Sequence, residues 1–201
     1  ITDFSLNRKR LNPNPSIENV HYLSTPAVSV DTLRLDQIHP IVSGNKWYKL
    51  RYYIDAAIQG KYTQIASFGG PYSNHLVALA YAAKLNGLKS TGYVRSNEGE
   101  PFTPTLTEAQ HYGMKLIHLG RASFQAKKLD LLHNLAANKD IYFIDEGGYG
   151  VLGARGASTI MCLQNDVENN AENKPSLYKY DYIVCAVGTG TMIAGIINGA
   201  A

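Results

Sequence analysis

The sequence predicts an α/β fold with largely parallel sheets. Short apolar runs alternate with segments of helical periodicity along the 201 residues, and this alternation is typical of βαβ units. Hydrophobic residues make up 45% of the chain and charged residues 17%, a composition typical of a folded globular protein. A chain of this length can bury a sizeable core, as one domain or as two small ones.

The first half of the chain predicts two strands and two helices. Residues 28–35 form an extended run, and residues 45–59 carry apolar side chains at helical spacing. Residues 64–68 are expected to form a short buried strand that ends at a Gly-Gly-Pro turn. Ser73 then opens a helix, and Asn86-Gly87 closes it, as a C-terminal glycine should.

The second half continues the same alternation. We expect strands at 91–95, 116–119, 141–144 and 182–187, and helices at 106–112, at 122–137 and after Gly188. The polar stretch 164–175 is expected to be a solvated loop or a helix end. Residues 182–187, YIVCAV, are apolar enough to predict the centre of a parallel sheet.

Charge and composition argue against several classes of protein. The net charge is +3 and the basic residues are scattered, so we expect no nucleic-acid partner. The apolar runs are too short to span a bilayer, so we expect no membrane insertion. Cys162 and Cys185 have no CxxC spacing, and Cys185 lies in an apolar run where a buried hydrophobe is expected. A cytoplasmic location fits this cysteine usage.

Both ends of the sequence predict an incomplete copy of a longer protein. The chain begins at Ile1 without an initiator methionine and stops at Ala201 inside a helical segment. Few strands precede residues 182–187 that could belong to the same sheet, so we expect exposed apolar surface there. We therefore expect that these residues alone are not a competent enzyme.

Three glycine-containing segments could carry chemistry, and the first includes two lysines. In Ser43-Gly44-Asn45-Lys46-Trp47-Tyr48-Lys49-Leu50, Lys46 follows a glycine turn at the start of a helix. Burial there would favour the neutral amine, which is the nucleophile toward an aldehyde. Lys49 lies one turn later on nearly the same face and could meet an anion such as a phosphate. The alternative is two exposed lysines on an amphipathic helix.

The second segment joins a strand to a helix through glycines. It reads Ser67-Phe68-Gly69-Gly70-Pro71-Tyr72-Ser73-Asn74-His75. Free N–H groups at the start of a helix can hold an anion such as a substrate carboxylate. The Asn74 amide beside them could donate to a phenolate oxygen. The alternative is structural, with Ser73 as an ordinary N-cap.

The third segment has the arrangement of a phosphate-binding turn. It follows the YIVCAV run and reads Val187-Gly188-Thr189-Gly190-Thr191-Met192-Ile193-Ala194-Gly195. Glycines let the backbone approach a phosphate closely, and threonine hydroxyls add donors. The spacing matches neither the Walker motif nor the dinucleotide fingerprint. The alternative is a glycine-rich connection that allows close helix packing.

Together these segments resemble the 1-aminocyclopropane-1-carboxylate deaminase/D-cysteine desulfhydrase family. The pattern is GNKxxKL, then GGxxSNH, then VGTGTxxAG, and the stretches TLTEA (105–109) and EGGYGVLG (146–153) also resemble it. The resemblance runs from about Leu33 to the end. It implies the two-domain fold-type II pyridoxal-phosphate architecture shared with the tryptophan synthase β-subunit. Residues 1–50 and 156–201 would belong to the larger cofactor domain, and residues 51–155 to a smaller α/β domain.

The same resemblance assigns residues to pyridoxal 5′-phosphate. Lys46 would be the Schiff-base lysine. Asn74 would lie against the 3′-oxygen of the cofactor, and Lys49 would assist at its phosphate. The turn that surrounds the phosphate would consist of Gly188, Thr189, Gly190 and Thr191.

The resemblance also implies a reaction. A small amino acid would be converted to a 2-oxo acid and ammonia, either by ring opening or by thiol elimination. Ser73 would bind the substrate carboxylate or carry a proton, with Asn74 and His75 beside it, and we expect a homodimer. Tyr72 replaces the glutamine typical of desulfhydrases, which leaves the substrate open. The alternatives are another fold-type II lyase or racemase, and a catalytically silent or regulatory cofactor-binding protein.

Overall fold

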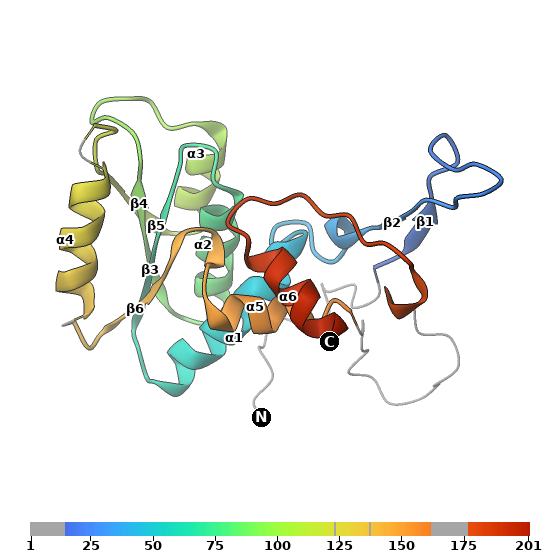
Figure 1. The fold of residues 1–201 in the computed structure, drawn as a ribbon. Coiled ribbons are helices and arrows are strands. Elements are labelled where there is room, and N and C mark those ends of the chain that lie inside the picture. Colours follow the sequence, from blue (N-terminus) through green and yellow to red (C-terminus); the bar gives the residue numbers. More distant parts are fainter. Residues whose placement is uncertain (1–14, 123, 137, 162–176) are drawn as a thin grey trace.

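A four-stranded parallel sheet forms the centre of one part of the molecule (Figure 1). The computed structural model describes residues 15–122, 124–136, 138–161 and 177–201. The strands are β3 (Gln64–Gly69), β4 (Lys89–Val94), β5 (Met114–His118) and β6 (Ile141–Ile144), in the order β5-β4-β3-β6. Each neighbouring pair is parallel. The predicted α/β class with a parallel sheet is confirmed.

Helices cover both faces of this sheet, which explains why its central strands are buried at all positions but the first. One face packs against α1 (Asn45–Gln59), α2 (Asn74–Leu85) and α3 (Pro104–His111). The other face packs against α4 (Phe124–Ala136), with Phe68 and Phe124 in a buried cluster between them. None of the helices in the described residues is long and apolar enough to cross a membrane.

A second hydrophobic cluster lies beside the first. It joins Leu35 and Ile38 to residues of α5 (Val151–Ser158) and α6 (Thr191–Ala200). The short antiparallel pair of β1 (Ile17–Asn19) and β2 (Asp31–Leu33) borders it. Helix α1 contributes to both clusters, so its position is fixed from two sides. The division of the chain into two domains stays a prediction.

Helix α5 was not expected from the sequence. It contains Gly153 and Gly156, and glycine disfavours helices. A Cβ atom on Gly156 would overlap the backbone carbonyl of Tyr48 in α1, and one on Gly153 would overlap the carbonyl of Gly148. The glycines therefore allow α5 to approach α1 and the preceding loop closely.

The strand predicted at residues 182–187 is absent, so that prediction is wrong in this structure. The segment is extended but joins neither sheet of the described residues. Val184 is 95% exposed and Tyr182 is 88% exposed. No described strand lies in position to complete a ladder with it, although its composition suits a sheet centre. The polar stretch 164–175 and Cys162 lie outside the described residues.

Candidate active site

The turn before α1 fixes the direction in which Lys46 leaves the backbone. The short 3₁₀ helix η2 (Leu35–Gln37) accepts two hydrogen bonds from this turn. The Gly44 N–H donates to the Leu35 carbonyl over 3.0 Å, and the Ser43 hydroxyl donates to the Asp36 carbonyl over 3.3 Å. Gly44 has φ +63°, in the left-handed region that favours glycine. Lys46 is the second residue of the helix that follows.

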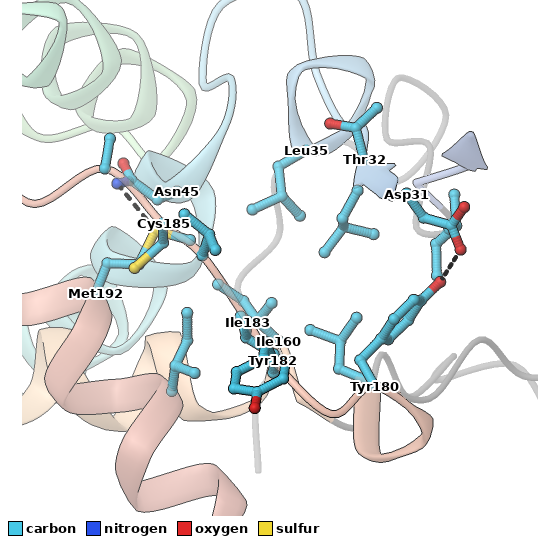
Figure 2. A pocket seen from close by; sticks show the side chains of 16 residues that line it. Asp31, Thr32, Leu35, Asn45, Ile160, Tyr180, Tyr182, Ile183, Cys185 and Met192 are labelled. Atoms are coloured by element: carbon cyan, nitrogen blue, oxygen red, sulfur yellow. Dashed lines mark hydrogen bonds between the residues drawn. The ribbon is translucent and has the colours of Figure 1, made fainter. Parts of the chain in front are cut away.

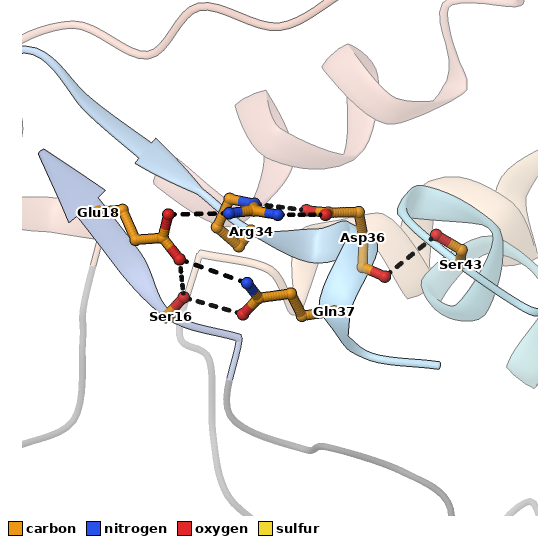
Figure 3. A network of polar contacts seen from close by, with 6 residues as sticks. All are labelled: Ser16, Glu18, Arg34, Asp36, Gln37 and Ser43. Carbon is orange, nitrogen blue, oxygen red and sulfur yellow. Dashed lines mark hydrogen bonds and ion pairs between the residues drawn. The ribbon is translucent and has the colours of Figure 1, made fainter. Parts of the chain in front are cut away.

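A polar network supports this turn from the side of β1 and β2 (Figure 3). The Arg34 guanidinium contacts Glu18 at 2.8 Å and Asp36 at 2.7 Å. The Ser16 hydroxyl lies 2.8 Å from Glu18 and 2.9 Å from Gln37. Exposed ion pairs contribute little stability one by one. The network therefore orients η2 more than it stabilises the fold.

Lys46 lies half-buried at the start of α1. Its Nζ donates a hydrogen bond to the Asn45 side-chain oxygen over 2.9 Å. Burial holds the pKa of the Lys46 amine below its usual range. A lowered pKa raises the fraction of neutral amine, which is the nucleophilic form.

Lys49 is more deeply buried, with 4% of its surface exposed. Its Nζ lies 3.3 Å from the Gly147 carbonyl oxygen and 3.4 Å from the Thr189 hydroxyl. Burial, and then the charge of Lys46, lowers the pKa of Lys49 to about 8. In the described part of the chain neither lysine forms an ion pair with a carboxylate.

The glycine turn before α6 closes a cavity over these two lysines. The cavity has a volume of about 170 Å³, and its lining includes Lys46, Lys49, Gly147, Gly188, Thr189 and Gly190. Gly190 has φ +79° and caps α6. Thr191 is 3% exposed and lies behind the turn, where its hydroxyl is 3.0 Å from that of Thr189. The structure thus brings together two sequence segments that lie more than 130 residues apart.

A second cavity lies on another side of Lys46. It has a volume of about 480 Å³, and its lining includes Lys46, Asn74 and Glu108. Asn74 is the first residue of α2, at the carboxyl end of β3. Ligands of parallel α/β sheets bind at this end of the strands. Lys46 lines both cavities, so its amine could meet a ligand that extends from one into the other.

Ser73 and His75 do not line these two cavities. The Ser73 oxygen caps α2 by accepting a hydrogen bond from the Leu76 N–H over 3.3 Å. His75 is 2% exposed, and its Nε2 lies 2.9 Å from the Ser67 hydroxyl. Burial, and then the charges of the two lysines, lowers the pKa of His75 to about 3, so its ring is neutral. His75 faces the protein interior, and its contact with a substrate stays a prediction.

Comparison with known proteins decides the family. The family model described as "Pyridoxal-phosphate dependent enzyme" matches residues 21–201. The chain belongs to this family of pyridoxal-phosphate dependent enzymes. The cofactor predicted from the sequence is therefore confirmed, and so is the fold-type II architecture.

Named relatives point in the same direction. A putative 1-aminocyclopropane-1-carboxylate deaminase of Thermotoga maritima is 31% identical over 83% of this chain and 52% of its own length. A bifunctional D-cysteine desulfhydrase/1-aminocyclopropane-1-carboxylate deaminase of Arabidopsis thaliana is 26% identical over 79% of this chain and 42% of its own length. The solved structure of an ACC deaminase homologue superposes with a TM-score of 0.73 at 21% identity, covering 94% of this chain and 58% of that one. The chain spans about half the length of the curated relatives it matches.

The residues around the two lysines fit pyridoxal phosphate. A Cβ atom on Gly188 or Gly190 would meet no atom within 4 Å, so the turn leaves room on its open side. The ammonium groups of Lys46 and Lys49 lie near each other, and the described residues place no carboxylate against either. The poorly compensated cation of Lys49 and the glycine turn suit a dianionic phosphate. Lys46 offers an amine to an aldehyde in the same place.

A third cavity, of about 350 Å³, lies beyond Asn45 (Figure 2). Residues 182–186 form one wall, and apolar side chains of α6 and Ile160 also line the cavity. Tyr180 donates a hydrogen bond of 2.7 Å to Asp31 at one end. At the other end the Asn45 amide contacts the Met192 sulfur at 3.3 Å. This cavity therefore shares Asn45 and Met192 with the cavity of the glycine turn.

Sequence reasoning missed several lining residues. Asn45 and Met192 lie next to predicted residues, but nothing in their type indicated a role. Gly147, by contrast, stands in the stretch EGGYGVLG noted for its resemblance to the family, and it follows strand β6 at the carboxyl end of a parallel strand. Glu108 stands in the stretch TLTEA, which was noted only for its resemblance to the family.

Proposed function

We propose that the protein of which this chain is a part is a pyridoxal-phosphate dependent deaminase or lyase of small amino acids. With D-cysteine the reaction would consume water and give pyruvate, sulfide and ammonia. With 1-aminocyclopropane-1-carboxylate it would consume water and give 2-oxobutanoate and ammonia. The observation that supports this most directly is that Lys46 lines both the cavity of the glycine turn and the cavity of Asn74.

Lys46 is proposed to hold the cofactor through its amine. Its half-buried position at the start of α1 favours the neutral form, which is needed for attack on an aldehyde. The same amine is proposed to move the proton at Cα, because an amine with a lowered pKa is a competent base near neutral pH. When bound, the cofactor supplies an electron sink for the pair released at Cα.

The glycine turn and Lys49 are proposed to hold the phosphate. The turn would offer backbone N–H groups of residues 188–191 at the start of α6, with the Thr189 hydroxyl as a further donor. Lys49 already donates to the Thr189 hydroxyl, so a small shift would bring its ammonium onto a phosphate oxygen.

Asn74 is proposed to contact the pyridine ring of the cofactor, and Ser73 is proposed to bind the substrate. Asn74 is exposed to the cavity of Lys46, and its amide could donate to the 3′-oxygen of the cofactor. The Ser73 oxygen accepts from the Leu76 N–H, so its own O–H remains able to donate to a substrate carboxylate. His75 would help to position this segment through its contact with the buried hydroxyl of Ser67.

Borohydride labelling of the complete natural protein tests the proposal. The protein should be purified yellow, and reduction should fix the cofactor to the peptide that contains Lys46. Release of 2-oxo acid from D-cysteine or from 1-aminocyclopropane-1-carboxylate should then be measured. Label on another lysine would contradict the site. A loaded protein that releases no 2-oxo acid from either compound would favour the silent cofactor-binding alternative.

A further inference from the structure

The cavity of Lys46 and Asn74 has an acidic residue in its wall that the proposed function does not use. Glu108 projects from α3, whereas Lys46 comes from α1 and Asn74 from α2. Three helices from separate parts of the chain thus meet at this cavity. Because the cavity adjoins the proposed cofactor lysine, its wall would also meet the side chain of a bound amino acid.

Glu108 is one of two charged side chains among the residues that line this cavity, and Lys46 is the other. The remaining lining residues are neutral, including Ser43, Asn45 and Val77. A lysine that holds the cofactor through its amine, or that serves as the neutral base at Cα, offers no full positive charge to the cavity. Of the residues that line this cavity, Glu108 would then be the one that presents a full charge to a substrate side chain.

The surroundings of Glu108 leave its charge available. One oxygen accepts a hydrogen bond of 3.4 Å from the Tyr112 hydroxyl, one turn further along α3. Within the described ranges it forms no ion pair with a lysine, arginine or histidine. A carboxylate without a cationic partner repels a second carboxylate and attracts a cation or a hydrogen-bond donor.

We propose that Glu108 sets the charge class of the substrate, admitting amino acids with neutral or cationic side chains and rejecting those with a second carboxylate. This inference rests on the proposed function, because it needs an amino acid in the cavity of Lys46. The substrate α-carboxylate is assigned to Ser73, which is not among the residues that line this cavity with Glu108. Glu108 therefore acts on the side chain and leaves recognition of the common amino-acid group unchanged.

Asparagine and aspartate form a suitable pair of probes, because they have nearly the same shape and differ in side-chain charge. The complete natural protein, loaded with pyridoxal phosphate, is titrated with each enantiomer of both amino acids. Binding is followed by the change in visible absorbance of the cofactor, so turnover is not required. Wild type should bind asparagine at least about fivefold more tightly than aspartate, since a like charge a few ångströms away costs about 1 kcal/mol in a solvated site.

Substitution of Glu108 should change this ratio in a graded way. E108Q should bring the two affinities within about twofold of each other, and E108K should reverse the preference. E98Q is the matched control, because Glu98 is also an exposed acid but does not line this cavity. Its ratio should equal that of wild type.

The outcomes separate this inference from the proposed function. A loaded wild-type protein without a preference for asparagine, whether it binds both compounds or neither, would overturn the role of Glu108 alone. The same holds if E108Q keeps the wild-type ratio. A complete protein that takes up no cofactor would overturn the proposed function and this inference with it.

Discussion

The Nζ atom of Lys49 lies 3.4 Å from the Oγ1 atom of Thr189, and this contact joins the start of α1 to the glycine turn before α6. Lys49 as a whole residue is 4% exposed, and the Gly147 carbonyl oxygen lies 3.3 Å from its Nζ atom. Both neighbouring oxygens are neutral, so a buried cation meets partial charges only. Such an arrangement is costly without an anion and favourable with one.

Replacing Lys49 by methionine should therefore stabilise the protein without cofactor and weaken cofactor binding. Its pKa is lowered from 10.5 to about 8, so at pH 7 the folded state carries an unfavourable charge. Stability should rise with pH between about 8 and 10.5 in wild type, because the unfolded state then binds more protons. K49M should raise the free energy of unfolding at pH 7 by about 1–3 kcal/mol and abolish this rise.

Urea unfolding of the cofactor-free protein between pH 7 and 10.5 checks the first half of this prediction. Equilibrium dialysis against pyridoxal phosphate checks the second, where K49M should bind at least about tenfold more weakly. Lys84 is exposed on α2 and gives the control K84M, which should change neither quantity. A K49M protein that is less stable and binds as well as wild type would contradict the role of Lys49.

His75 should make the cofactor-free protein sensitive to acid. Its pKa is lowered from 6.5 to about 3 by burial, so the folded state keeps the ring neutral while the unfolded state takes up a proton. The neutral His75 ring makes its full contribution to the free energy of unfolding above pH 6.5, and this contribution is lost as the pH falls toward 3. The loss should be about 1.4 kcal/mol per pH unit in that range.

The difference between wild type and H75Q isolates this effect from the titrating carboxylates. Between pH 6 and pH 4, H75Q should take up about one proton fewer on unfolding than wild type does. The slope of its unfolding free energy against pH should therefore be smaller by about 1.4 kcal/mol per pH unit. The exposed His111 provides the control H111Q, whose pH dependence should match wild type. Equal slopes in H75Q and wild type would show that His75 is not buried as a neutral ring.

Much of the fold could be predicted because its signals are local. Helix α1 begins and ends where the apolar periodicity predicted, and Ser73 caps α2 as its residue type indicated. Strand β6 also has the predicted bounds. Caps, turns and apolar periods depend on residues a few positions apart, so a single sequence contains them.

The remaining features depend on contacts between distant segments. Helix α5 is glycine-rich, and only its packing against α1 explains why it forms. Residues 182–187 have the composition of a strand, but composition cannot show whether a partner strand lies beside them. Glu108 reaches the cavity of Lys46 because α2 and α3 pack together, which no short motif encodes.

Gly156 should be intolerant of any side chain. A Cβ atom there would overlap the Tyr48 carbonyl and lie 3.5 Å from the Lys49 backbone nitrogen. G156A should therefore push α5 away from α1 and cost about 1–3 kcal/mol of stability. It should also weaken cofactor binding, because Lys49 lies on the displaced turn of α1.

Thermal unfolding and cofactor titration of G156A check this expectation. G70A is the matched control, since a Cβ atom on Gly70 would meet Arg95 at an ordinary distance of 4.0 Å. Its melting temperature should remain within a few degrees of wild type. A G156A protein as stable as G70A would show that α5 and α1 are further apart than described.

The apolar segment 182–187 should cause the isolated 201-residue chain to self-associate. Val184 is 95% exposed and Val187 is 64% exposed, and the backbone of the segment is extended without a ladder partner among the described strands. Exposed, apolar, unpaired extended backbone is a template for pairing with another chain. V184K should suppress this association, because a charge at the centre of the segment opposes pairing.

Sedimentation velocity over a range of concentrations measures the effect. Val151 is also 84% exposed but lies at the start of α5, so V151K serves as the control and should associate as wild type does. A wild-type chain that stays monomeric at every concentration would show that another part of the molecule covers this segment.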